Sequence, residues 1–243
     1  MKVCLASTST REIFKDNYKK IPYLLESFYY FKDWQIPLLQ TAQLFLVDSG
    51  AFTFMNGSKG KVDFNAYLDK YIDFINKNNV KHFFELDIDS VVGYDNVKKL
   101  RTKLEQETGK KCIPVWHKSR GLEEWKLMCK EYDYVAIGGI VTKEIGKEDF
   151  KYFKPLLEIA RQNNCKVHGL GFTAVAELPK YKFYSVDSTS WLSGGRYGQL
   201  HAFRNNTIEN IKPKNVRAKN YKQIDYHNLE QWLKYQEYAD KYL

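Results

Sequence analysis

Apolar runs that finish in a carboxylate recur along the chain. The runs cover residues 44–52, 82–89 and 183–191, and their acids are Asp48, then Asp87 with Asp89, then Asp187. Side chains alternate along a strand, so Phe183, Ser185 and Asp187 are expected on one face. Strands that end in acids and then break at Gly, Ser or Thr are typical of the carboxyl-terminal face of a (β/α)8 barrel. A solvated loop acid or a helix N-cap is the alternative for each one.

The remaining pattern predicts alternating strands and helices. Further strands are expected at 3–7, 112–117, 134–141, 166–172 and 198–203, and helices at 22–31, 63–77, 96–108, 122–131, 148–163 and 228–243. The chain has 243 residues, no sequence repeat and no Ser/Pro-rich linker. These features predict an α/β fold in a single domain over 1–243, with a closed eight-stranded TIM-type barrel favoured over an open doubly wound sheet. Residues 212–243 are expected to form a basic segment and a helix packed on the barrel.

The run over 82–89 carries more acids than the others. On a regular strand Glu85, Asp87 and Asp89 would share one face, directed at the pocket, while Phe84 and its alternating neighbours would face the outer helices. Asp-x-Asp is also a divalent-cation pattern, but a lone pair of this kind is weak and we predict no metal site. His117 ends the next strand, where a structural or loop histidine is the more common reading.

The composition and the net charge limit the classes of protein to which this chain can belong. The chain is 44% hydrophobic and 16% aromatic, which excludes a disordered protein, and its net charge of +9 favours a polyanionic partner such as nucleic acid. The segment 212–222 has no acid and is either a solvated linker or a phosphate-backbone contact. Four widely spaced cysteines, no apolar run of membrane-spanning length and no signal-peptide pattern predict a reduced cytoplasmic protein without membrane contact.

Five motifs occur in an order that resembles the tRNA-guanine transglycosylase superfamily. They are Asp48-Ser49-Gly50-Ala51-Phe52, Leu86-Asp87-Ile88, Gly138-Gly139-Ile140, His168-Gly169-Leu170-Gly171, and Asp187 followed by Gly195-Arg196-Tyr197-Gly198-Gln199. The likeness is greatest to the short phage and bacterial relatives that put 7-deazaguanine bases into DNA. Two features depart from the family: Trp116-His117 replaces a Gln-Gly pair, and the Cys/His zinc site is missing. The resemblance therefore implies a barrel without the zinc subdomain.

The resemblance also implies roles for individual residues. Asp187 would be the nucleophile that forms a covalent aspartyl-sugar intermediate, and Asp48 would handle protons. Residues implied to bind the substrate are Asp87, Gly138, Gly139, Ile140, Phe52, His117, His168 and Arg196. Phe52, Trp116 and Trp191 are candidates for stacking on a flipped base, although aromatic residues are more often core.

The sequence thus predicts a pentosyltransferase that exchanges guanine in DNA for a 7-deazaguanine such as 7-cyano-7-deazaguanine, without a cofactor. If the gene belongs to a phage, the expected location is the host cytoplasm. Base exchange in tRNA is the alternative within the same class. A (β/α)8 glycoside hydrolase would also need paired carboxylates. A catalytically inert nucleic-acid-binding barrel is the third alternative.

Overall fold

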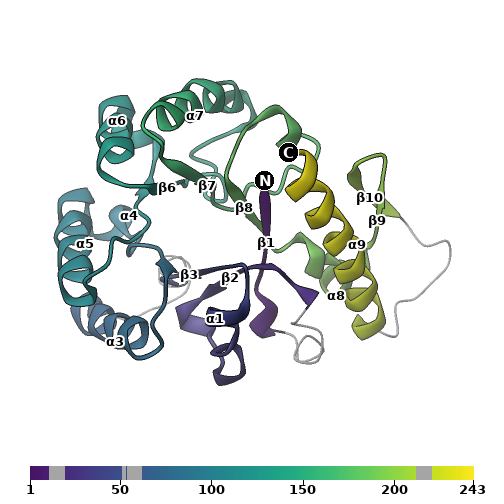
Figure 1. Ribbon diagram of the computed structural model, residues 1–243, viewed down its shortest axis with the longest axis horizontal. Helices are drawn as coiled ribbons and strands as arrows, with labels where there is room; N and C mark the ends of the chain where they lie inside the picture. Colours follow the sequence, from purple (N-terminus) through teal and green to yellow (C-terminus); the bar gives the residue numbers. More distant parts are fainter. Residues whose placement is uncertain (11–19, 51–52, 54–61, 212–220) are drawn as a thin grey trace.

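The computed structural model describes residues 1–10, 20–50, 53, 62–211 and 221–243. In this part of the chain eight parallel strands form one sheet in the order β4-β3-β2-β1-β8-β7-β6-β5. They are β1 (Lys2–Ala6), β2 (Tyr23–Ser27), β3 (Leu44–Asp48), β4 (His82–Phe83), β5 (Val115–Trp116), β6 (Tyr134–Ile137), β7 (Lys166–Gly169) and β8 (Ser185–Ser188). A parallel bridge between Phe84 and Ile113 joins the two ends of this order, so the sheet closes. The predicted (β/α)8 barrel is confirmed (Figure 1).

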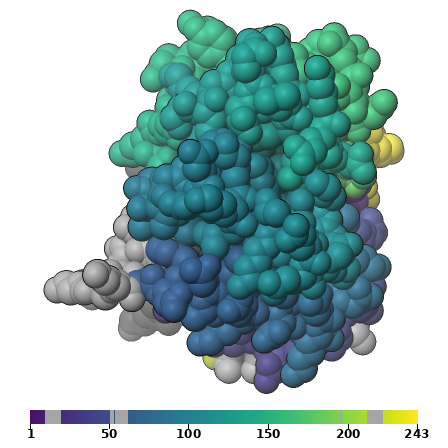
Figure 2. Space-filling view, turned by 90° about the vertical axis from the view of Figure 1, so that its left-hand side faces the viewer, coloured from purple at the N-terminus to yellow at the C-terminus, as the bar shows by residue number. Residues whose placement is uncertain are grey.

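Helices surround the strands. The α-helices are α1 (Leu38–Thr41), α3 (Phe64–Lys77), α4 (Asp89–Val92), α5 (Tyr94–Thr108), α6 (Gly121–Glu131), α7 (Phe153–Gln162), α8 (Ser193–Tyr197) and α9 (Tyr221–Tyr242). Short 3-10 turns are η1 (Thr8–Thr10), η4 (Phe28–Tyr30), η5 (Asp33–Gln35), η6 (Lys118–Arg120), η7 (Lys147–Tyr152), η8 (Leu178–Lys180) and η9 (Ser190–Leu192). On the side that Figure 2 shows, the helices from α3 to α6 cover the strands.

Local sequence signals set several helix ends as expected. The Asp63 carboxylate caps α3 by accepting hydrogen bonds from the backbone N–H groups of Asn65 and Ala66. Gly109 ends α5 in the left-handed region at φ 66°, which a residue without Cβ adopts at little cost. The predicted helix at 148–163 is divided, because η7 precedes α7 there.

Two predicted elements were wrong. The segment 22–31 forms strand β2 and the turn η4 instead of a helix. Tyr23, Leu24 and Leu25 are all buried, as in a parallel strand covered on both faces, and such a continuous apolar run lacks the alternation that marks an exposed strand. The segment 198–203 is not the eighth barrel strand: β9 (Leu200–Arg204) pairs antiparallel with β10 (Thr207–Ile211) in a separate hairpin.

The C-terminal helix α9 packs on the barrel beside β1 and the hairpin of β9 and β10 (Figure 1). Its buried face includes Trp232 and Tyr235. The Gln236 amide donates to the Val3 carbonyl (2.6 Å), and the Met1 ammonium donates to the Ala239 carbonyl (2.9 Å). These contacts hold the two ends of the chain together. The basic residues 212–220, predicted to precede this helix, lie outside the described residues.

Glu85 is turned away from the barrel interior, contrary to the acidic face predicted for 82–89. Strand β4 ends at Phe83, after which Phe84 points inward and packs on His168. The fully buried Glu85 carboxylate accepts a hydrogen bond from the Val115 N–H at 2.8 Å. Because regular pairing stops here, strand alternation cannot fix the faces of the residues that follow.

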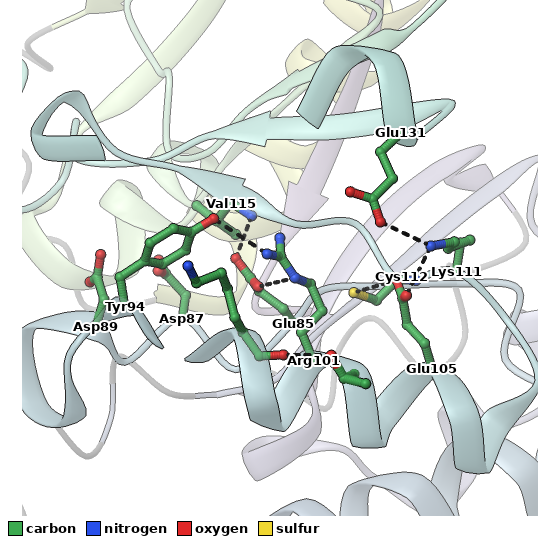
Figure 3. A network of polar contacts seen from close by, with 12 residues as sticks. Glu85, Asp87, Asp89, Tyr94, Arg101, Glu105, Lys111, Cys112, Val115 and Glu131 are labelled. Carbon is green, nitrogen blue, oxygen red and sulfur yellow. Dashed lines mark hydrogen bonds and ion pairs between the residues drawn. The ribbon is translucent and has the colours of Figure 1, made fainter. Parts of the chain in front are cut away.

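Two guanidinium groups neutralise this buried carboxylate, and Figure 3 shows one of them, Arg101, beside Glu85. Arg101 on α5 lies 3.5 Å from Glu85 Oε2, and Arg120 after β5 lies 3.3 Å from Oε1. Burial raises the pKa of Glu85, and both arginines oppose that rise. The network links α5, β4 and β5 at the point where the barrel closes.

Removing the Glu85 carboxylate should destabilise the protein strongly. Glu85→Ala removes the buried carboxylate that Arg101 and Arg120 share, and breaking a buried ion pair from one side typically costs about 3–5 kcal/mol. The free energy of unfolding, measured by urea denaturation, checks this. Glu123→Ala is the control, because it removes a carboxylate from the exposed pair with Lys126, where a loss below about 1 kcal/mol is expected. Equal losses in the two variants would contradict the assigned role of Glu85.

Candidate active site

A cavity of about 710 Å³ opens at the carboxyl-terminal ends of the strands. Its charged lining residues are Asp48, Asp87, Asp89, His117, Glu144 and Asp187, and its backbone lining includes Gly138, Gly139 and Ile140. These residues follow β3, β4, β5, β6 and β8, so they come together only because parallel strands all end at the same face. The predicted convergence of Asp48, Asp87 and Asp187 in one pocket is therefore confirmed.

Asp187 lies in β8 and is held by two donors. The Gly171 N–H donates to Asp187 Oδ1 (2.6 Å), and His168 Nε2 lies 3.2 Å from the same oxygen. His168 is fully buried, and its Nδ1 lies 2.6 Å from the Ser185 hydroxyl, which also bonds Tyr134. A carboxylate only accepts, so Nε2 carries a proton and donates to Asp187. The buried chain of hydrogen bonds fixes the direction in which Asp187 points.

Asp48 ends β3, and its Oδ2 accepts a hydrogen bond from the Gly50 N–H at 3.0 Å. Burial raises the pKa of Asp48 to about 6, and the negative charges of Asp87 and Asp187 contribute to the rise. The Gly50 N–H limits the rise by stabilising the ionised form. Asp48 can therefore exchange a proton near neutral pH, as a general acid or base must.

His117 lies between two carboxylates. Its Nε2 is 2.8 Å from Asp87 Oδ1, and its Nδ1 is 2.8 Å from Glu144 Oε2. Burial by itself would lower the pKa of His117, but Asp87, Glu144 and the nearby Asp89 raise it to about 9. At neutral pH the imidazolium donates to both acids and keeps Asp87 oriented towards the cavity.

Arg120 connects the pocket to the closure network. Its guanidinium lies 3.0 Å from Asp89 Oδ2, 3.7 Å from Asp87 Oδ1 and 3.3 Å from Glu85 Oε1. The guanidinium carbon also lies 4.1 Å from the centre of the Tyr94 ring. Figure 3 shows Asp87 and Asp89 side by side next to Tyr94. Arg120 therefore offsets the repulsion between acids that the irregular end of β4 crowds together.

Within the described residues, Asp87, Asp89 and His117 place one ligand atom each within 4.8 Å of one another. This spacing would suit a cation. However, His117 is hydrogen-bonded to Asp87 and Arg120 pairs with both aspartates, so the acids already have cationic partners. The predicted contact of Asp87 with a base stays a prediction.

Gly138 and Gly139 follow β6 and allow the backbone there to pass close to neighbouring side chains. A Cβ at Gly138 would lie 2.7 Å from Val115 Cγ1 and 2.9 Å from His117 Cε1. Gly139 has φ +82°, a conformation that side chains rarely adopt. The close approach to the backbone of this glycine pair, predicted from the sequence, is confirmed. At Gly138 the His117 ring and the Val115 side chain fill the space that a Cβ would need.

Four other residues that were predicted at the site do not line the cavity or cannot be placed there. Arg196 is exposed on α8 and is not among the residues that line the cavity. Trp116 and Trp191 are core residues whose indole N–H groups donate to the carbonyls of Gly121 and Ala6, so neither can stack on a base. Phe52 lies outside the described residues.

Three residues of the site were missed. Tyr30 lines the cavity and is 48% exposed. A strand reading of 22–31 would have placed it at a strand end, where the other site residues were sought. Glu144 and Arg120 lie in loops beyond strands, and no local sequence pattern distinguishes them from solvated charges.

No helix in the described part of the chain combines the length and apolar character needed to cross a bilayer.

Comparisons with known proteins give little further detail. No family model matches the chain, and no curated protein matches it. Among solved structures, the chain is similar to "QR15, an Aldolase", with a TM-score of 0.44 and 12% identity over 78% of this chain and 89% of that one. It is also similar to the carboxyl transferase domain of Rhizobium etli pyruvate carboxylase, with a TM-score of 0.46 and 12% identity over 99% of this chain and 47% of that one. The barrel assignment rests on the strand order and its closure.

Proposed function

We propose that the protein is an enzyme that exchanges guanine in nucleic acid for a 7-deazaguanine base. The observation that carries this proposal is the set of three strand-end aspartates, Asp48, Asp87 and Asp187, around one cavity with different partners for each. Base exchange needs three separate carboxyl functions: a nucleophile, a proton carrier and a group that reads the base.

Asp187 is the nucleophile in this proposal. Its free oxygen attacks C1′ of the target nucleotide, the bond from C1′ to N9 breaks, and the electron pair leaves with guanine. Protonated Asp48 gives its proton to the departing base. In the second half, N9 of the incoming base attacks C1′, its proton passes to the Asp48 carboxylate, and the ester to Asp187 breaks. The hydrogen bonds from Gly171 and His168 hold the attacking group in place, which is what a displacement at a fixed centre needs.

Asp87 reads the base. An ionised carboxylate accepts hydrogen bonds from guanine N1–H and N2–H, donors that adenine does not present at that edge. The His117 imidazolium supports this role, since it donates to Asp87 and holds the carboxylate in place. Both guanine and 7-deazaguanine carry these two donors, so the same group serves the leaving and the entering base.

A nucleic-acid substrate agrees with the net charge of +9. The target nucleotide has to leave its stack to reach the cavity, and Tyr30 at the cavity offers a partly exposed ring to stack on. DNA is the preferred substrate in this proposal, and tRNA is the alternative. A (β/α)8 glycoside hydrolase would use the same carboxylates with water and would not depend on a guanine-like acceptor.

Replacing the nucleophile should abolish exchange. Asp187→Asn keeps the size of the side chain but removes its charge, so incorporation of labelled guanine or 7-cyano-7-deazaguanine into DNA should fall at least about a thousandfold. Asp73→Asn, at an exposed position of α3, is the control and should retain full incorporation. Matched DNA and tRNA separate the two substrates. Absence of label in both with folded wild-type protein would rule out the proposed exchange.

The pH dependence of exchange should report Asp48. Its raised pKa of about 6 means that the protonated donor is lost above that pH, so kcat/KM for the nucleic acid should fall as pH rises through about 6. Asp48→Asn should lower kcat/KM by about 10²–10⁴-fold and remove this step from the profile. A pH profile of Asp48→Asn with the wild-type step would show that another group carries the proton.

His117 should make the free energy of unfolding fall as pH rises above neutral. Its pKa is about 9 in the folded protein, above the ordinary 6.5, so its stabilisation is present below pH 6.5 and is lost as pH rises through about 9. Because Asp87 and Glu144 are partly exposed, the difference should be about 1–2 kcal/mol in the free energy of unfolding. His117→Gln should abolish it in urea denaturation at pH 6.5 and 9.

His82→Gln is the matched control for this measurement. Burial lowers the pKa of His82, so its contribution changes below pH 6.5 and not between 6.5 and 9. An alkaline decline retained by His117→Gln would contradict the charged state assigned to His117.

A further inference from the structure

A second cavity, of about 660 Å³, adjoins the first and is called the hairpin groove here. It lies between η7, the loop that follows β7 and the hairpin of β9 and β10. Thr173 and Ser190 line both cavities, so the two adjoin there. The groove thus borders the cavity that holds Asp187, the carboxylate that attacks the sugar in the proposed reaction.

The groove has a preorganised floor. Trp232 of α9 donates its indole N–H to His201 Nδ1 (2.9 Å), and His201 Nε2 lies 2.9 Å from the Ser193 hydroxyl. Burial lowers the pKa of His201 to about 4, so the ring is neutral at physiological pH. Its single proton therefore lies on Nε2, because Nδ1 accepts from Trp232. His201 cannot take a proton from Ser193, which excludes an activated serine and leaves a binding surface.

The two cavities differ in the charge of the residues that line them. The first is lined by five carboxyl groups, those of Asp48, Asp87, Asp89, Glu144 and Asp187. A strand whose base enters that cavity must carry its phosphates elsewhere, since like charges at short range repel strongly in a partly buried site. The junction residues Thr173 and Ser190 are neutral hydroxyl donors, which suits a sugar-phosphate passing over them.

The part of the groove that η7 forms is more favourable to phosphate. Lys147 and Lys151 line it, and within the described residues neither ammonium group lies at ion-pair distance from a carboxylate. Glu177 also lines the groove, but its two oxygens each accept from Lys180 at 2.9 Å. Glu148 is the remaining acid there. The hairpin adds the polar side chains of Thr207 and Asn210.

We propose that the hairpin groove binds the sugar and phosphate of the nucleotide next to the exchanged one, in a single strand drawn out of its stack. Lys147 and Lys151 contact the phosphate, and Thr173 and Ser190 contact the backbone where it leaves the first cavity. This inference rests on the proposed base exchange, because it is the sugar at Asp187 that fixes where the strand enters the groove.

Paired lysine variants of the full chain test the groove. Lys147→Ala/Lys151→Ala is compared with Lys99→Ala/Lys130→Ala, which removes the same charge from exposed positions of α5 and α6. Binding of a single-stranded DNA oligonucleotide with one guanine is followed by fluorescence anisotropy at several salt concentrations. The groove variant should reduce the slope of log affinity against log salt by about 1–1.5, as expected for two lost phosphate contacts. The control should keep the wild-type slope.

Kinetics of label exchange supply the second readout. The groove variant should raise KM for the oligonucleotide while KM for the free 7-deazaguanine base stays unchanged, because the base does not enter the groove. Equal slopes and equal KM values in the groove variant and wild type would overturn the groove and leave base exchange standing. Groove-dependent binding without any exchange in wild type would instead refute the proposed function. Wild type that neither binds the strand nor exchanges label would overturn both.

Discussion

The buried pairing of Glu85 with Arg101 and Arg120 is the interaction on which the rest of the structure depends. Strands β4 and β5 are short and meet through the bridge of Phe84 with Ile113, so side chains must supply what the backbone ladder does not. Glu85 binds the β5 backbone at Val115 and two guanidinium groups at once. Since Arg120 also pairs with Asp87 and Asp89, the same side chain that helps to close the barrel places these two acids at the cavity.

The site manages like charges by giving each acid a different environment. Asp48 is half-buried, accepts from the Gly50 backbone and has a raised pKa, whereas Asp87 bonds the His117 imidazolium and Asp187 accepts from Gly171. Acids that share one pocket repel one another, so their separate partners give the three carboxyl groups different properties. This division is what lets one cavity perform attack, proton transfer and base recognition in the proposed reaction.

The hairpin groove offers the phosphates of the proposed substrate a binding surface outside the acidic cavity. An acidic cavity suits a neutral base with hydrogen-bond donors and repels the phosphates that accompany it. The groove offers hydroxyl groups and ammonium groups instead. In the proposed reaction base and backbone therefore have separate destinations, and the sugar that joins them lies between the two cavities.

The sequence by itself determined which strand ends bring acids into the cavity. Acids that close apolar runs must lie at the end of a buried strand, and parallel strands share that end, so Asp48, Asp87 and Asp187 could be placed together. It also determined the N-cap at Asp63 and the helix end at Gly109, because both depend on nearby backbone alone. Contacts within a few residues are encoded locally and can be predicted locally.

Only the tertiary structure decided the remaining features. It made part of 22–31 the strand β2 because both faces are covered by distant parts of the chain, and it turned Glu85 outward because its arginines come from α5 and η6. Arg196, expected at the site from its motif, is exposed on α8, while Arg120 in η6 and Glu144 in the loop after β6 reach the site without a local sequence signal. Burial and ion pairing between segments far apart in sequence are properties of the folded arrangement, and no local pattern contains them.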